Sequence, residues 1–152
     1  MSRKHWRRAC DNDRMPESLS SEHYSATLID HFEHPRNAGA MVGADAEAYV
    51  TNPVCGDSMR IFLRFASGRI AAASFLTSGC PAAIGTSSAA TELVQGRTLD
   101  EAVALTREDF ADAVGGLPKS KLHCSVLAAA AVRQAIEQWQ GEHAGAATEV
   151  EA

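Results

Sequence analysis

The sequence lacks long hydrophobic runs: no stretch approaches the roughly 20 consecutive apolar residues that a membrane-spanning helix needs. It also has little cysteine, and four widely spaced cysteines are too few to staple a small disulfide-rich scaffold. No apolar segment follows the basic start of the chain, which argues against a secretory signal peptide and for a cytoplasmic protein. The composition that is present is ordinary, with 45% hydrophobic and 22% charged residues in 152 positions, so we expect one globular domain with a real core.

Positive charge is scarce beyond residue 14. The first fourteen positions hold five of the 14 basic residues, which leaves 9 basic against 17 acidic residues in the rest of the chain. Because phosphate contacts need positive charge, we expect no nucleic-acid partner, and without an apolar run we expect no membrane partner. Residues 1–20 mix charge with Ser, Pro and Asn and show no hydrophobic periodicity. They are predicted to form a disordered basic tail, in which Cys10 is an incidental exposed thiol.

The remainder opens with a predicted helix. Ser20 or Ser21 can cap it, and Pro35 ends it because the residue before a proline disfavours helical dihedral angles. His31 and His34 lie near its end. Their spacing does not fit the His-Glu-x-x-His pattern of zinc enzymes, so we interpret them as capping or exposed residues.

Alternation of apolar and polar residues then predicts strands. A short strand includes residues 48–50, and a longer one over 59–65 has one mostly buried face. Ser67-Gly68 is a two-residue hairpin turn, after which residues 70–76 supply the return strand. Together these segments predict a meander of three antiparallel strands.

After Cys80 the pattern becomes helical. The predicted helices are residues 82–95 following Pro81, one capped by Thr98, a short one around Phe110, and a final one with an apolar stripe over 127–139. Strands first and helices second predict an α+β fold, in which helices cover one face of a small three-stranded antiparallel sheet. We place this domain at residues 21–140 and expect a disordered C-terminal tail at 141–152.

Three cysteines fall at breaks between the predicted elements. Cys55 lies in a turn between strands, Cys80 where strand gives way to helix, and Cys124 at the start of the last helix. Such positions favour the thiolate, which is the form that binds metals. Asp57 and His123 stand close to two of these cysteines in the sequence, so three sulfurs with one nitrogen or oxygen could bind Zn²⁺ or an iron–sulfur cluster.

The same cysteine, aspartate and histidine residues could instead have purely structural roles, without binding a metal. A free cysteine is often a small buried hydrophobic residue, although such a residue usually lies in an apolar run, unlike Cys55 beside Gly and Asp. Asp57 alone could satisfy the backbone of its own turn, and His123 alone could be an ordinary surface or core histidine. A catalytic dyad of His123 and Cys124 is disfavoured, because adjacent side chains point apart and no orienting partner is evident.

The chain resembles the iron–sulfur cluster scaffold proteins of the IscU/NifU N-terminal family, from about Tyr24 to Trp139. Several separate motifs carry the resemblance in the right order and spacing. They are Asp30-His31-Phe32-Glu33-His34-Pro35-Arg36-Asn37, Cys55-Gly56-Asp57, Gly79-Cys80 followed by Ala83-Ile84 and Ser87-Ser88, Leu117-Pro118, Lys121, and His123-Cys124-Ser125-Val126-Leu127-Ala128.

The resemblance implies a function and a set of site residues. Family members are not enzymes; they accept sulfur from a cysteine desulfurase, bind Fe²⁺, use an electron donor such as ferredoxin, and build a transient [2Fe–2S] cluster for recipient apo-proteins. By this resemblance Cys55, Cys80 and Cys124 are the cluster ligands, with His123 or Asp57 as the fourth. Cys124 matches the main sulfur acceptor and Asp57 an aspartate linked to cluster lability. Lys121 matches a lysine near the site, whose charge we expect to lower the pKa of Cys124 together with the helix start.

Two departures from the family pattern bear on the cluster and on partners. Pro81 follows the second cysteine where the family commonly has glycine, and proline removes a backbone N–H that could donate to a cluster sulfur. The stretch Leu117-Pro118-Lys119-Ser120-Lys121 replaces the family's Leu-Pro-Pro-Val-Lys, which argues against recognition by an Hsp70-type chaperone. The 43 residues between Cys80 and Cys124 leave no room for the insertion of SufU-type members. The alternatives are a SufU-like sulfur acceptor that binds Zn²⁺ and stimulates a desulfurase, or a structural zinc module.

Overall fold

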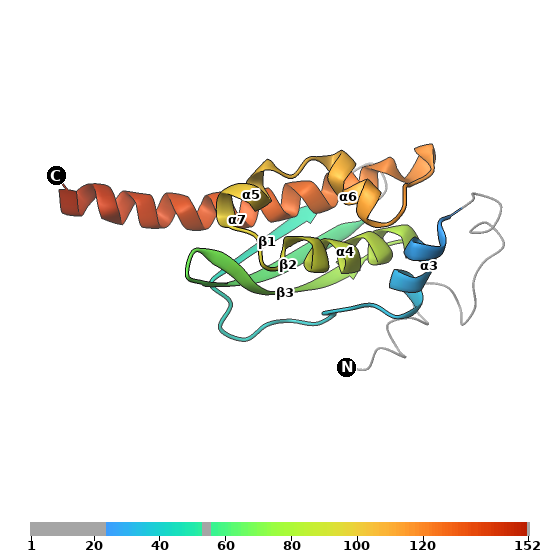
Figure 1. Ribbon diagram of the computed structural model, residues 1–152, viewed down its shortest axis with the longest axis horizontal. Helices are drawn as coiled ribbons and strands as arrows, with labels where there is room; N and C mark the ends of the chain where they lie inside the picture. The colour runs from blue at the N-terminus through green and yellow to red at the C-terminus, as the bar shows by residue number, and fades with distance from the viewer. Residues whose placement is uncertain (1–23, 53–55, 152) are drawn as a thin grey trace.

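The structure, a computed structural model, describes residues 24–52 and 56–151, with side chains as far as residue 142 (Figure 1). Cys10, Cys55 and the predicted Ser20 or Ser21 cap lie outside the described residues. Along the chain the elements are α3 (Ala26–Glu33), β1 (Ala46–Thr51), β2 (Ser58–Ala66), β3 (Arg69–Ser78), α4 (Pro81–Val94), α5 (Leu99–Ala104), α6 (Arg107–Ala113), the short 3₁₀ helix η1 (Lys119–Lys121) and α7 (Leu122–Glu151).

The predicted meander is confirmed. The three strands form one antiparallel sheet in the order β1-β2-β3, with Ile61 of β2 opposite both Ala48 of β1 and Phe75 of β3. Ser67 and Gly68 connect β2 to β3 with φ angles of 56° and 76°. Two successive residues with positive φ characterise the tight hairpin turns whose twist matches that of the strands.

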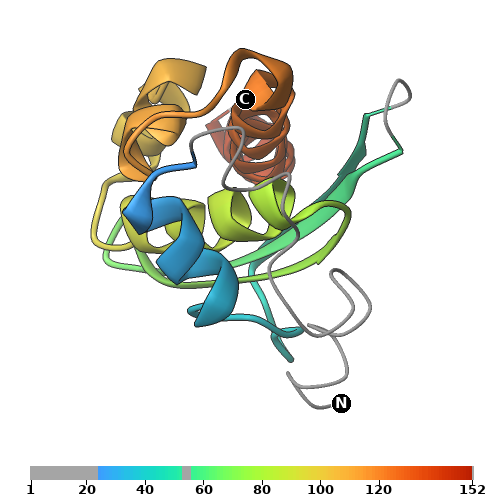
Figure 2. The same cartoon turned by 90° about the vertical axis from the view of Figure 1, so that its right-hand side faces the viewer.

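Helices α4 and α7 lie side by side on one face of this sheet, as Figures 1 and 2 show. α7 packs against β1 and β2, and α4 packs against β3. Between them and the sheet lies a buried core to which the central strand contributes Met59, Ile61 and Leu63. Farther along α7, the ring of Trp139 meets the ring of Phe65 edge-on at 4.8 Å between centroids. The α+β fold predicted from the sequence is therefore the observed one.

The first described helix starts later than the sequence suggests. Its N-cap is Ser25, whose hydroxyl accepts a hydrogen bond from the Leu28 N–H at 2.9 Å and donates one to the Val114 carbonyl. The hydrogen bond to Val114 ties the cap residue Ser25 to the loop after α6. The two segments approach so closely that a Cβ on Gly115 would lie 2.9 Å from the Ser25 Oγ atom. The end of the helix agrees with the prediction, with His34 as C-cap just before Pro35.

Close approach explains a glycine inside α4. A Cβ on Gly85 would lie 2.6 Å from the Leu28 Cδ1 atom and 3.0 Å from the Leu28 carbonyl oxygen. Gly85 thus lets α3 and α4 pack at a separation that no side chain would allow, which offsets its poor helix propensity.

The helix capped by Thr98 starts as predicted, and α6 contains Phe110, around which a short helix was expected. Thr98 and Thr106 each form a reciprocal capping box, with Glu101 and Asp109 respectively. α7 continues to Glu151, so the backbone stays helical through the segment predicted to be a disordered tail. That segment has no proline, and its Ala and Glu residues favour helix. The domain boundaries at residues 21 and 140 remain a prediction. Within residues 24–52 and 56–151, no helix combines the length and the apolar character needed to span a membrane.

Candidate metal centre

Three chain segments bring chemically reactive side chains to one end of the domain, where α4 and α7 begin (Figure 1). Asp57 immediately precedes β2, Cys80 lies between β3 and α4, and His123 and Cys124 are in the first turn of α7. The Asp57 Oδ2 atom lies 3.3 Å from the His123 Nε2 atom and 3.8 Å from the Cys80 Sγ atom. The donor atoms of Asp57, His123 and Cys124 all lie within 4.8 Å of one another. Four of the predicted site residues therefore share one site, and the fifth, Cys55, lies outside the described residues.

The loop before β2 holds Asp57 in place. The Asn52 N–H donates to the Asp57 carbonyl at 2.8 Å, and the Gly56 N–H donates to the Asn52 carbonyl at 2.7 Å. The carboxylate is buried, with 6% of the residue exposed, and it lies directly beside Gly79. A Cβ at Gly79 would come within 2.6 Å of Asp57 Oδ1, so the glycine before Cys80 is what leaves room for the carboxylate.

Cys80 is the N-cap residue of α4 and is half-buried. A hydrogen bond from the Cys124 thiol lowers the pKa of Cys80 to about 6, and the Ala83 N–H and the charge of Lys121 contribute in the same direction. Burial and the Asp57 charge oppose this shift. The net effect favours the thiolate form of Cys80.

Cys124 behaves in the opposite way, and the expectation of a lowered pKa there was wrong. Its thiol donates to the Cys80 sulfur and only 2% of the residue is exposed, and both effects raise the pKa of Cys124 above its ordinary range. Lys121, in η1, counteracts this only in part. A helix start favours a thiolate only when the sulfur is not itself a hydrogen-bond donor in an apolar setting.

The donor set suits a thiophilic metal. Two sulfurs, one imidazole nitrogen and one carboxylate oxygen are ligands that Zn²⁺ accepts in tetrahedral sites and that iron accepts in iron–sulfur sites. His123 keeps 27% of its side chain exposed, so one side of the group is open to solvent. The group is therefore compact enough for a metal ion and is not fully enclosed.

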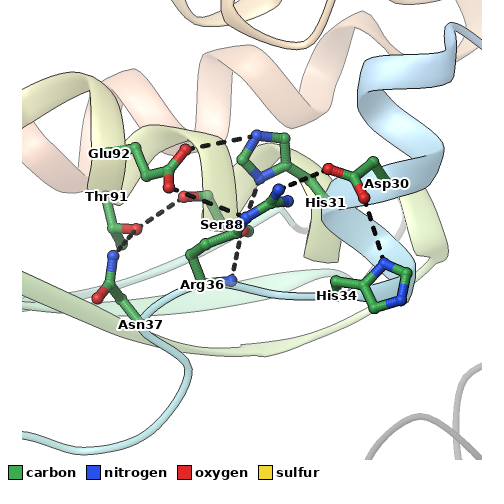
Figure 3. A network of polar contacts seen from close by, with 8 residues as sticks. All are labelled: Asp30, His31, His34, Arg36, Asn37, Ser88, Thr91 and Glu92. Atoms are coloured by element: carbon green, nitrogen blue, oxygen red, sulfur yellow. Dashed lines mark hydrogen bonds and ion pairs between the residues drawn. The ribbon is translucent and has the colours of Figure 1, made fainter.

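Sequence reasoning missed a second polar cluster, between α3 and α4 (Figure 3). His31 is not a capping or exposed residue: it is 6% exposed, and its Nδ1 atom lies 2.8 Å from the Ser88 Oγ atom. The Arg36 N–H also donates to Ser88, and the Arg36 guanidinium pairs with Asp30. The signal in the sequence was the run of small hydroxyl residues in α4, whose poor helix propensity indicates that they serve contacts instead. His34, by contrast, is exposed and caps the helix as expected.

Comparison with known proteins gives consistent matches. A family model described as "NifU-like N terminal domain" matches residues 23–146. The chain is 52% identical over 113 residues to iron-sulfur cluster assembly scaffold protein IscU 1 of Archaeoglobus fulgidus, which covers 74% of each chain. It is 41% identical over 123 residues to the scaffold protein IscU of Escherichia coli strain K12, covering 78% of this chain and 95% of the other.

The fold agrees with that of a solved relative. The crystal structure of the N-terminal part of a nitrogen-fixing NifU-like protein from Brucella abortus superposes with a TM-score of 0.69 at 21% identity, covering 81% of this chain and 98% of the other. Site geometry, sequence similarity and fold lead to one conclusion: the chain belongs to the family of NifU-like N-terminal domains.

Proposed function

We propose that this protein is a non-enzymatic scaffold for iron–sulfur cluster assembly, which builds a transient [2Fe–2S] cluster and transfers it to apo-proteins. The observation that carries the proposal is the convergence of Asp57, Cys80, His123 and Cys124 at one partly open end of the domain. It is supported by relatives named as cluster assembly scaffolds. Cys55 completes the proposed ligand set by its place in the sequence, two residues before Asp57.

Sulfur enters, in this proposal, from the persulfide of a cysteine desulfurase. A thiolate of the scaffold attacks the outer sulfur, so that a new S–S bond forms while the desulfurase recovers its thiolate. We assign the acceptor role to Cys124. Its buried thiol must first lose its proton, because burial and the hydrogen bond to Cys80 favour the thiol form in the free protein. Two electrons from a donor such as ferredoxin then reduce the persulfide to sulfide and restore the Cys124 thiolate.

The ligands have different roles in binding and releasing iron. Cys80 and the other thiolates hold Fe²⁺ and the growing cluster, which are the substrates of the process. Asp57 and His123 offer a harder oxygen or nitrogen ligand, and such a ligand holds iron less firmly than a fourth thiolate, which favours release. Lys121 supplies positive charge close to the thiolates.

Anaerobic reconstitution tests the proposal. The full chain is incubated with a cysteine desulfurase, cysteine, a reductant and Fe²⁺, and we expect the visible absorbance of a [2Fe–2S] cluster that an apo-ferredoxin then takes up. Alanine variants of Cys55, Cys80 and Cys124 should each lose most of this absorbance. A wild-type chain that forms no cluster, or three variants that form it normally, would contradict the proposal.

A zinc-dependent sulfur acceptor of the SufU type is the second candidate. It is favoured by one observation: Asp57, His123 and Cys124 are compact enough for a single tetrahedral Zn²⁺ ion. Metal analysis of the purified protein, followed by a desulfurase assay without iron, separates the two functions. A zinc-loaded chain that stimulates the desulfurase and never forms a cluster would establish the second.

A further inference from the structure

A relay of two buried hydroxyl groups joins the end of β3 to the first turns of α4. The Thr77 hydroxyl donates to the Ser87 Oγ atom at 2.7 Å, and the Ser87 hydroxyl donates to the Ala83 carbonyl at 2.7 Å. Thr77 is 8% exposed and Ser87 is 2% exposed, so neither hydroxyl has ready access to water as a replacement partner.

The end of β3 places a hydroxyl in a row of otherwise apolar side chains. The positions of β3 opposite Leu63, Ile61 and Met59 of the central strand are Ala73, Phe75 and Thr77. The first two belong to the apolar core between sheet and helices, whereas the third ends the row with a polar group. An apolar residue at position 77 would continue the core pattern. The polar residue found there, Thr77, lies just before the turn that leads into Cys80.

The relay spans the turn that carries the site cysteine. Thr77 lies three residues before Cys80, and Ala83 lies three residues after it. The Cys80 carbonyl accepts the first helical hydrogen bond, from the Ile84 N–H at 3.1 Å. The Ala83 Cβ atom also lies 3.2 Å from where a Cβ on Gly79 would be. Both sides of the Gly79-Cys80 turn are therefore tied to each other through Ser87.

We propose that Thr77 and Ser87 are positioning residues for the Cys80 sulfur: their hydroxyl relay fixes the first turn of α4 to the end of β3 and so sets the place of this ligand relative to Asp57 and Cys124. The inference rests on the proposed function, in which Cys80 is a metal ligand. Groups outside the ligand shell act on metal affinity in this way when they orient a ligand, and losing one typically weakens binding about 10- to 100-fold.

Anaerobic titration of the full chain with Co²⁺ tests the proposal, because cobalt bound by thiolates gives a charge-transfer absorbance that reports on the sulfur ligands. Thr77→Val removes the first donor, and Ser87→Ala removes the acceptor while favouring helix. We expect each variant to bind Co²⁺ about tenfold more weakly and to shift the sulfur-to-cobalt band. Thr77→Ser keeps the hydroxyl and should restore wild-type binding.

Ser88→Ala is the matched control. Ser88 is the next residue of α4 and is equally buried, but its hydroxyl contacts His31 and Arg36 of the α3 region instead of β3. We expect this variant to lower the free energy of unfolding while its Co²⁺ affinity stays within about twofold of the wild type. If Ser88→Ala weakens Co²⁺ binding as much as Ser87→Ala does, or if Ser87→Ala binds like the wild type, the positioning role is refuted.

Cys80→Ala separates this inference from the proposed function. If it leaves the affinity and the band unchanged, Cys80 is not a ligand, and the proposed function loses one of its thiolates. If it weakens and shifts the band while Thr77→Val and Ser87→Ala match the wild type, the ligand role holds and only the positioning role fails.

Discussion

Helix α4 is held on two sides by contacts of different chemistry. Toward the sheet, Ala90 and Val94 belong to an apolar core shared with the strands and α7. Toward α3, Ser88 and Glu92 meet His31 and Arg36 in the polar cluster of Figure 3. The first contact depends on volume and buried area, whereas the second depends on partner geometry and on protonation. One helix thus combines a support that does not depend on pH with another that does.

The apolar side should show the largest effect of a single substitution. Ile61 is fully buried at the centre of the middle strand. Ile61→Ala removes three carbons and leaves a cavity, and we expect it to lower the free energy of unfolding by about 2–5 kcal/mol, measured by urea denaturation. This loss should be the same at pH 6 and pH 8, and a strong dependence on pH would contradict the comparison.

Gly85→Ala tests the close packing of α3 on α4. The new methyl group would meet the Leu28 side chain, which can move, and the Leu28 carbonyl oxygen, which cannot move without shifting the helix. Overpacking of this kind costs about 1–3 kcal/mol, against about 1 kcal/mol gained from helix propensity. We expect a net loss of stability by thermal denaturation. A variant more stable than the wild type would mean that the helices separate easily.

A buried hydroxyl in α4 should yield a gain. Thr86 is 1% exposed, and its Oγ1 atom has no hydrogen-bond partner within the described residues. Thr86→Val replaces this unsatisfied group with a methyl group of similar size, so we expect the free energy of unfolding to rise by about 1 kcal/mol in urea denaturation. A loss of stability would show that the hydroxyl has a partner in solution.

The polar side should show its dependence on pH through His31. Burial, followed by the charge of Arg36, lowers the pKa of His31 below its ordinary value of 6.5, although Glu92 and Asp30 oppose the shift. The folded protein therefore binds fewer protons at this site than the unfolded chain does. Stability from this source is complete above pH 6.5 and is lost as the pH falls toward the folded pKa.

His31→Gln should reduce the dependence of the unfolding free energy on pH as the pH falls below 6.5, because glutamine does not titrate. His34→Gln is the control, since His34 is exposed at the end of the same helix. Equal slopes in the wild type and His31→Gln would place the pH dependence elsewhere.

Local patterns made much of the fold predictable. The alternation in β2 and the Ser67-Gly68 turn depend on neighbours in sequence, and both were predicted correctly. The cap at Ser25 and the burial of His31 depend on residues more than 50 positions away, so no local rule selects them. Within the site, breaks between elements indicated where Cys80 and Cys124 would meet. The opposite pKa shifts of the two thiols follow from their mutual hydrogen bond, which the sequence does not display.

The distance along the chain between the site residues has a mechanical consequence. Asp57 and His123 are 66 positions apart, yet their side chains are in contact. An ion that bridges them closes a large loop, and the chain-entropy relation for such a closure gives about 4 kcal/mol, comparable to a disulfide. Cargo in this site would act as a reversible cross-link, so delivery of the cluster would also release a tether between the sheet and the last helix.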